Sequence, residues 1–182
     1  MLARLLLCAA IALAGCAAGT HETQQRPWSA NELAAVRLDP SAAVADLNAY
    51  RAGKGLTPVR LDPALTAVAE GQARAMASAD SLSHDAGGSF PSRLAATGID
   101  ATEAGENLGG GYMSLGEAMN GWRHSPGHDA NLLMPGASRF GIAIAKNANT
   151  QYGVYWAMEI AAEPRPAAGQ GGSMWGAPIG VR

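Results

Sequence analysis

The sequence predicts an α+β domain in which helices pack on a β-sheet. Two observations carry this prediction. Apolar residues recur at helical spacing through residues 41–79, and residues 140–145 and 154–160 alternate as paired strands do. Between these parts lies a centre rich in glycine and polar residues. The expected order is therefore helices, a loop-rich centre, a further helix and an antiparallel hairpin.

Two helices are expected in the first half of the domain. Ser41 follows a proline and is placed to cap the first helix, which should end at Gly53. A short extended piece over residues 56–61 leads to the second helix. Asp62 as the capping residue and Pro63 at the first helical position are a strong start signal. The helix that follows is rich in alanine and should pack closely against a neighbour.

Loops and short helices are expected in the centre. Residues 90–96 have the pattern of a short helix, whereas residues 104–111 form a glycine-rich stretch that suits backbone conformations other residues avoid. Ser114 and Glu117 have the spacing of a capping box, so a helix should begin there. It should end near Ser125, because a proline follows.

The end of the domain is expected to be a hairpin. Phe140 and Ile142 alternate with small residues, residues 147–150 form the turn, and Trp156 lies on the return strand. We expect Trp122 and Trp156 to belong to the core.

The first residues indicate the cellular compartment. Residues 1–15 hold one arginine and then an apolar run that is too short to span a membrane, which is the anatomy of a secretory signal peptide. The sequence Leu-Ala-Gly before Cys16 resembles the lipobox of bacterial lipoproteins. This resemblance implies cleavage before Cys16 and lipid, palmitate included, on that residue. A plain signal peptide without lipid is the alternative.

Composition divides the chain into four segments. Residues 1–15 are the expected signal peptide, 16–39 a flexible tether, 40–163 the folded domain and 164–182 a tail rich in glycine, proline and alanine. The domain is long enough for one hydrophobic core.

Charge and cysteine content exclude several classes of function. The net charge of −2 and the lack of a basic run argue against a nucleic-acid partner. Cys8 would leave with the signal peptide and Cys16 would be modified, so the mature domain has no thiol for a disulfide, a zinc–thiolate site or a cysteine nucleophile.

Two histidines have the spacing of a metal pair on a helix. His124 and His128 are four residues apart, but Pro126 and Gly127 lie between them and disfavour a continuous helix. We therefore expect His124 at the end of one helix and His128 at the start of another turn.

A different set of residues could hold a metal. His84, Glu106 and His128 lie in or beside the loop-rich centre, and imidazole and carboxylate are the ordinary ligands of zinc. Each also has a purely structural reading, because lone histidines usually make hydrogen bonds and Glu106 could bind the backbone of its own loop.

Several motifs in order resemble one family. They are Gly-Glu-Asn at residues 105–107, Ser-Pro-Gly-His at residues 125–128 with Asn131 shortly after, and Tyr-Trp at residues 155–156. This arrangement resembles the CAP superfamily (cysteine-rich secretory protein, antigen 5 and pathogenesis-related 1; the SCP domain), in its bacterial secreted branch. The resemblance implies a three-layer α-β-α sandwich with an antiparallel central sheet.

The family's cleft carries two histidines and two glutamates, sometimes around a divalent metal such as zinc. The resemblance assigns the cleft to His84, Glu106 and His128, with Asn107 orienting the loop. Ser125 stands where animal and plant members have the second glutamate, so this chain offers three of the four cleft groups.

The lipobox resemblance implies an exported, lipid-anchored protein of the cell envelope, and Ala17 after Cys16 favours the outer membrane if the cell is Gram-negative. Its expected role is to bind a lipid, a small hydrophobic ligand or a protein without catalysis. Two alternatives stay open. One is a metal-dependent hydrolase or peptidase, for which Asp85 or Glu103 would have to act as base. The other is a structural envelope protein with a relic cleft.

Overall fold

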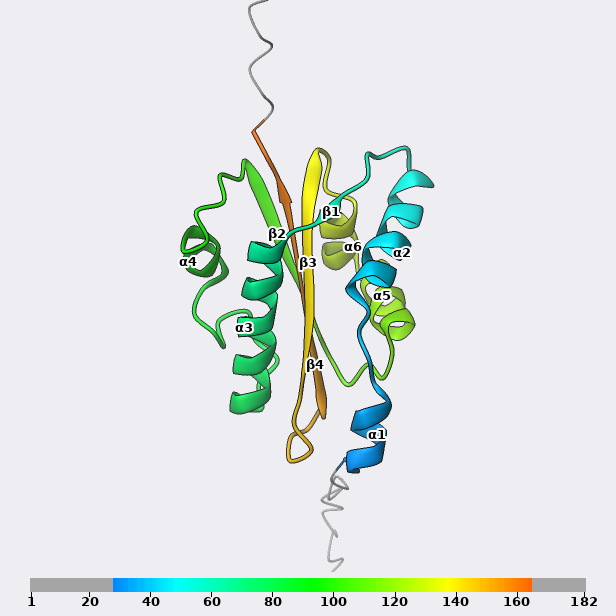
Figure 1. Ribbon diagram of the computed structural model, residues 1–182, viewed down its shortest axis with the longest axis vertical. Coiled ribbons are helices and arrows are strands. Elements are labelled where there is room, and N and C mark those ends of the chain that lie inside the picture. Colours follow the sequence, from blue (N-terminus) through cyan, green and yellow to red (C-terminus); the bar gives the residue numbers. More distant parts are fainter. Residues whose placement is uncertain (1–27, 165–182) are drawn as a thin grey trace, which may run out of the picture.

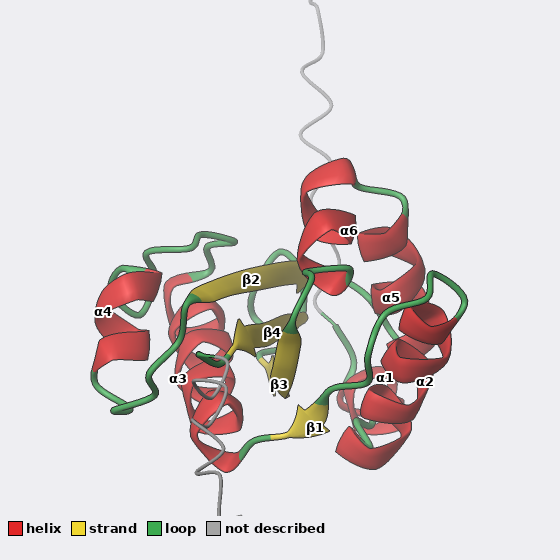
Figure 2. Ribbon diagram, turned by 90° about the horizontal axis from the view of Figure 1, so that it is seen from above, coloured by secondary structure: helices red, strands yellow, loops and turns green. Residues whose placement is uncertain are grey.

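A four-stranded β-sheet lies between two layers of helices in this computed structural model, which describes residues 28–164 (Figures 1 and 2). The expected α+β class and the three-layer α-β-α sandwich are therefore confirmed. The predicted signal peptide, Cys16 and the tail beyond Pro164 lie outside the described residues.

The helices are α1 (Ala30–Ala35), α2 (Pro40–Ala52), α3 (Pro63–Ala79), α4 (Phe90–Ala95), α5 (Leu115–Arg123) and α6 (Pro126–Leu132). The strands are β1 (Arg60–Leu61), β2 (Glu103–Gly110), β3 (Ala137–Lys146) and β4 (Val154–Ala162). Helices α3 and α4 cover one face of the sheet, and α1, α2, α5 and α6 lie on the other side (Figure 2).

The sheet has the strand order β1-β3-β4-β2. Strands β3 and β4 form the predicted hairpin, and β2 pairs antiparallel with the other side of β4. The two-residue strand β1 pairs parallel with β3, so the sheet is antiparallel apart from this short edge.

The glycine-rich stretch at residues 104–111 is a strand, whereas the sequence indicated a loop. Within it only Gly111 has a positive φ, of 80°. The other glycines make room for neighbours: a Cβ atom would lie 2.5 Å from the Asn131 side chain at Gly105 and 2.7 Å from the Tyr112 ring at Gly109. These glycines therefore serve close packing, not unusual backbone conformations.

Two helix starts differ from those expected. Asp39 caps α2 by accepting hydrogen bonds from the amides of Ser41 and Ala42, so Ser41 lies inside the first turn. Ser114 caps α5 as predicted, but the Glu117 carboxylate accepts from the amide of Met113 instead of closing the box on Ser114.

The folded part begins earlier than residue 40. Helix α1 lies within the segment that we expected to be a tether, and Leu33 and Val36 are buried in the core. Ser29 and Glu32 form a full capping box at its start. Apolar burial and capping explain why these residues are ordered with the domain.

A hydrophobic core lies on each face of the sheet. Trp122 and Trp156 are fully buried on the side of α2 and α5, as predicted, and each indole donates to a backbone carbonyl. On the other side α3 packs directly on β3 at Gly141, where a Cβ atom would lie 2.3 Å from the backbone of Leu65. Small residues at this contact, among them Ala69, allow the close approach.

The helices of residues 28–164 are all too short, or not apolar enough, to cross a membrane.

Candidate functional site

Glu106 is the centre of a buried polar cluster on the α3 side of the sheet. Its side chain is only 2% exposed. Nδ1 of His84 donates to one carboxylate oxygen at 2.6 Å, and Nη2 of Arg93 donates to the other at 2.7 Å. The structure therefore brings His84 and Glu106 together as expected and adds Arg93.

Arg93 lies on α4 and reaches under the loop that carries His84. Its Nε donates to the carbonyl of Gly88 at 2.9 Å, and its Nη2 also donates to the carbonyl of His84 at 3.0 Å. The guanidinium group stacks over Phe90, 5.6 Å from the ring centre. Sequence reasoning missed Arg93, because an arginine in a short polar helix usually lies in solvent.

Glu159 on β4 is a second buried carboxyl group and lies directly opposite Glu106 in the strand register. It is fully buried, and neither of its oxygens has a hydrogen-bond partner among the described residues. Nη1 of Arg93 lies 3.6 Å from it. Burial and the adjacent Glu106 carboxylate raise the pKa of Glu159 well above its ordinary value.

The loop with His84 is fixed to α3 by one glutamine. The amide group of Gln72 donates to the carbonyl of Ser83 at 2.6 Å, and its oxygen accepts from the amide of Gly87 at 3.1 Å. Gln72 itself is fully buried. The position of His84 is therefore set by the helix core, while its side chain remains 59% exposed.

His128 lies in the first turn of α6, which two asparagines attach to β2. Asn107 donates to the carbonyl of His128 at 3.0 Å, and Asn131 donates to the Asn107 side chain and to the carbonyl of Glu106. Burial lowers the pKa of His128, and the nearby His84 lowers it further. His128 thus lies near His84 and favours its neutral form.

The two remaining residues of the predicted motif have local roles. Ser125 is the N-cap of α6, although its side chain makes no capping hydrogen bond, and Pro126 follows as the first helical residue. His124 ends α5, and its ring lies 2.8 Å from the carbonyl of Asn120. The proline separates His124 from His128 as the sequence indicated.

The residue types of the cleft suit zinc, but their arrangement does not offer three free donors. Both oxygens of Glu106 are taken by His84 and Arg93. Within residues 28–164, no three His, Cys, Asp or Glu side chains are grouped so that they could hold a metal ion. Direct ligation by Glu106 does not fit this arrangement, and the set of His84, Glu106 and His128 stays a prediction.

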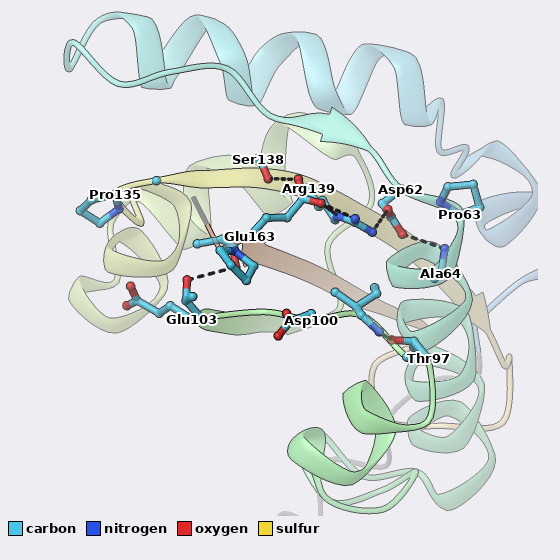
Figure 3. Close-up of a pocket in the computed structure, with 16 residues that line it drawn as sticks. Asp62, Pro63, Ala64, Thr97, Asp100, Glu103, Pro135, Ser138, Arg139 and Glu163 are labelled. Atoms are coloured by element: carbon cyan, nitrogen blue, oxygen red, sulfur yellow. Dashed lines mark hydrogen bonds and ion pairs between the residues drawn. The ribbon is translucent and has the colours of Figure 1, made fainter. Parts of the chain in front are cut away.

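A separate open groove of about 1160 Å³ lies at the end of the sheet where β2 and β3 begin. Arg139 extends along one side toward Asp62, to which it donates at 3.0 Å, and it also pairs with Glu163. Asp100, on the segment that leads into β2, and Glu103, the first residue of β2, lie across the groove (Figure 3). Its lining has four carboxylates and one guanidinium group.

Comparisons with known proteins agree with the fold and the motifs. A model of the cysteine-rich secretory protein family, CAP, matches residues 44–160, which is more than half of the chain. The chain therefore belongs to the cysteine-rich secretory protein (CAP) family.

Individual relatives are distant. The chain is 28% identical over 102 residues to the uncharacterized protein YkwD of Bacillus subtilis, a match that covers 55% of this chain and 40% of that protein. An extracellular SCP-domain protein of Bacillus anthracis has a TM-score of 0.59 at 23% identity, over 68% of this chain and 40% of that chain. An outer surface protein of Borrelia burgdorferi has a TM-score of 0.60 at 19% identity, over 70% and 97%. At these identities, the structural likeness concerns the fold alone.

Proposed function

We propose that this protein is an exported, lipid-anchored CAP domain that binds a ligand and does not catalyse a reaction. One observation carries the proposal. The Glu106 carboxylate of the family cleft is 2% exposed and already paired with His84 and Arg93, so it is not free to act as a base itself. Ser125, where the second glutamate of other members would stand, is a helix N-cap. A general base has to reach its substrate directly or through one water.

The groove at the end of the sheet is the better place for a ligand. It is open, and its excess of carboxylates favours a cationic or strongly polar partner over a lipid. The described surface supports the same choice, because Leu82 is the only large hydrophobic side chain of residues 28–164 that is exposed. A basic segment of another envelope protein fits this description.

Site-specific cross-linking tests the groove. A photo-reactive amino acid is placed at Asp100 in the groove and, as a matched control, at Arg74 on the exposed side of α3. We expect a discrete adduct from position 100 in the exporting cell, and we expect Glu103→Lys to reduce it strongly. Equal adducts at both positions, or none at position 100, would contradict binding in the groove.

The lipid anchor is a separate part of the proposal. It rests on the lipobox-like sequence before Cys16, and the extracellular and outer surface relatives are in keeping with export. Cells that express the chain are labelled with palmitate, and membranes are separated from the soluble fraction. The parent should carry label and sediment with membranes, whereas Cys16→Ser should do neither. A parent protein without label would contradict lipidation at Cys16 and leave the plain signal peptide as the interpretation.

A hydrolase is the second candidate, and one contact favours it. Glu106 binds Nδ1 of the exposed His84, which leaves Nε2 free, and a carboxylate behind an imidazole is a common arrangement for a general base. Parent and His84→Ala proteins are compared on ester, peptide and glycan substrates. Turnover by the parent that His84→Ala abolishes would replace the binding proposal with this one.

A further inference from the structure

Two carboxyl groups at the centre of one buried cluster require a nearby cation. Glu106 and Glu159 lie opposite each other on β2 and β4, and their side chains are 2% and 0% exposed. Burial of two adjacent carboxylates without a positive charge would be strongly unfavourable. Among residues 28–164, Arg93 is the cation that reaches both of them, at 2.7 Å and 3.6 Å.

Arg93 is held in place independently of the carboxylates. The carbonyls of His84 and Gly88 accept hydrogen bonds from it, and Phe90 lies against its guanidinium group. Its side chain is only 11% exposed. The backbone contacts to His84 and Gly88 therefore fix the position of the guanidinium group.

We propose that the Arg93 guanidinium is the resident cation of the CAP cleft in this protein, and that it keeps divalent metal ions away from Glu106 and Glu159. It binds one oxygen of Glu106 directly, lies 3.6 Å from Glu159, and places a positive charge beside both carboxyl groups. Glu159 is a second buried carboxyl group beside Glu106, and it lies on β4 and not at Ser125, where the family pattern has its second glutamate.

The inference does not rest on the proposed binding function. It follows from the donors that Arg93 occupies. Without the guanidinium group, the Glu106 oxygen that Arg93 now binds would be free, and a carboxylate oxygen is an ordinary zinc ligand. Removal of Arg93 should therefore strengthen metal binding at Glu106 and not weaken it.

Calorimetric titration with Zn²⁺ tests the inference on the mature full-length chain. The proteins are the parent, Glu106→Gln, Arg93→Met, Arg93→Met with Glu106→Gln, and Arg74→Met as a control at an exposed arginine. We expect Arg93→Met to bind Zn²⁺ at least about tenfold more tightly than the parent, and the added Glu106→Gln to remove the gain. Arg74→Met should titrate like the parent.

Two results would overturn the inference. One is tight binding by the parent that Glu106→Gln abolishes, because the metal would then reach Glu106 past Arg93. The other is an Arg93→Met protein with the affinity of the parent.

Arg93→Met leaves two buried carboxyl groups without a neighbouring cation and can unfold for that reason, so its thermal midpoint is measured with and without Zn²⁺. Zn²⁺ should raise the midpoint of Arg93→Met and leave that of the parent unchanged. If Arg93→Met does not fold even with Zn²⁺, the titration uses Arg93→Met with Glu159→Gln, which removes one of the two buried carboxyl groups. The same gain in affinity is expected there, and its absence counts against the inference.

Discussion

Two buried arginines lie on opposite sides of the same sheet and differ in how well they are paired. Arg51 on α2 is fully buried and donates only to backbone carbonyls, those of Thr57, Leu132, Met134 and Ala137. Burial lowers its pKa. Arg93 lies beside two carboxyl groups, yet its Nη1 and both oxygens of Glu159 have no hydrogen-bond partner among the described residues.

The difference separates a structural contact from a candidate site. Arg51 joins the end of α2 to the segment between α6 and β3, and each of its nitrogens has a partner, as is usual for buried polar groups. The cluster of Arg93, Glu106 and Glu159 leaves polar atoms unsatisfied. Buried polar atoms without partners are more typical of functional sites than of the rest of a fold.

The largest expected effect is at Arg51. Arg51→Met would leave several buried carbonyls without donors, so we expect it to lower the free energy of unfolding by about 4 kcal/mol. The thermal midpoint measured by circular dichroism should fall by roughly 10 °C. Arg74→Met, which removes an exposed i,i+4 pair with Glu70, should change it little. Similar losses for both variants would show that the hydrogen bonds of Arg51 do not stabilise the fold.

The contact between α6 and β2 comes next. Asn131→Ala removes the donor to Glu106 and Asn107, and we expect a loss of about 2 kcal/mol in urea unfolding. Gly105→Ala introduces a Cβ atom into the same Asn131 side chain and should have a similar cost. If Gly105→Ala is neutral while Asn131→Ala is not, then the packing at β2 is looser than the distances indicate.

The buried Glu159 side chain should make the free energy of unfolding depend on pH, an effect that we do not expect from Arg51. The folded-state pKa of Glu159 is raised above the ordinary value of 4.5. The contribution of Glu159 to stability is therefore complete below pH 4.5 and is lost as the pH rises through the folded-state pKa. Glu159→Gln removes this loss. We expect the variant to gain about 1 kcal/mol over the parent at pH 8 and little at pH 4. A constant difference across this range would show that Glu159 does not titrate as a buried acid.

The smallest expected effect is at His84. Its side chain is 59% exposed, and the loop that carries it is held by Gln72 and Arg93. His84→Ala should therefore change the unfolding free energy by less than about 1 kcal/mol. Gln72→Ala should cost more, because it removes a fully buried side chain and leaves the backbone groups of Ser83 and Gly87 without their partner. A larger loss for His84→Ala than for Gln72→Ala would show that the His84 side chain, and not Gln72, stabilises the loop.

Local signals in the sequence were enough for most of the fold. Asp62 and Pro63 start α3, and the alternation around Phe140 marks β3. Strand β2 was missed because Leu108 is its one large apolar side chain and its glycines accommodate residues distant in sequence, such as Asn131. The β-propensity of single residues cannot reveal a strand whose composition is set by the side chains that pack against it.

The site was predicted in the same uneven way. Motifs located His84, Glu106 and His128, and the structure brings the first two into contact. Glu159 was not found because a polar residue in an alternating strand reads as solvent-facing, whereas both faces of β4 are buried. Only the register that places it opposite Glu106 identifies the pair.

The most direct test of the central claim is a crystal structure of the protein grown with excess Zn²⁺ and measured at the zinc absorption edge. The account predicts that the Arg93 guanidinium group occupies the space beside Glu106 and Glu159, with no anomalous peak there. An anomalous peak within bonding distance of Glu106, with Arg93 displaced into solvent, would contradict it.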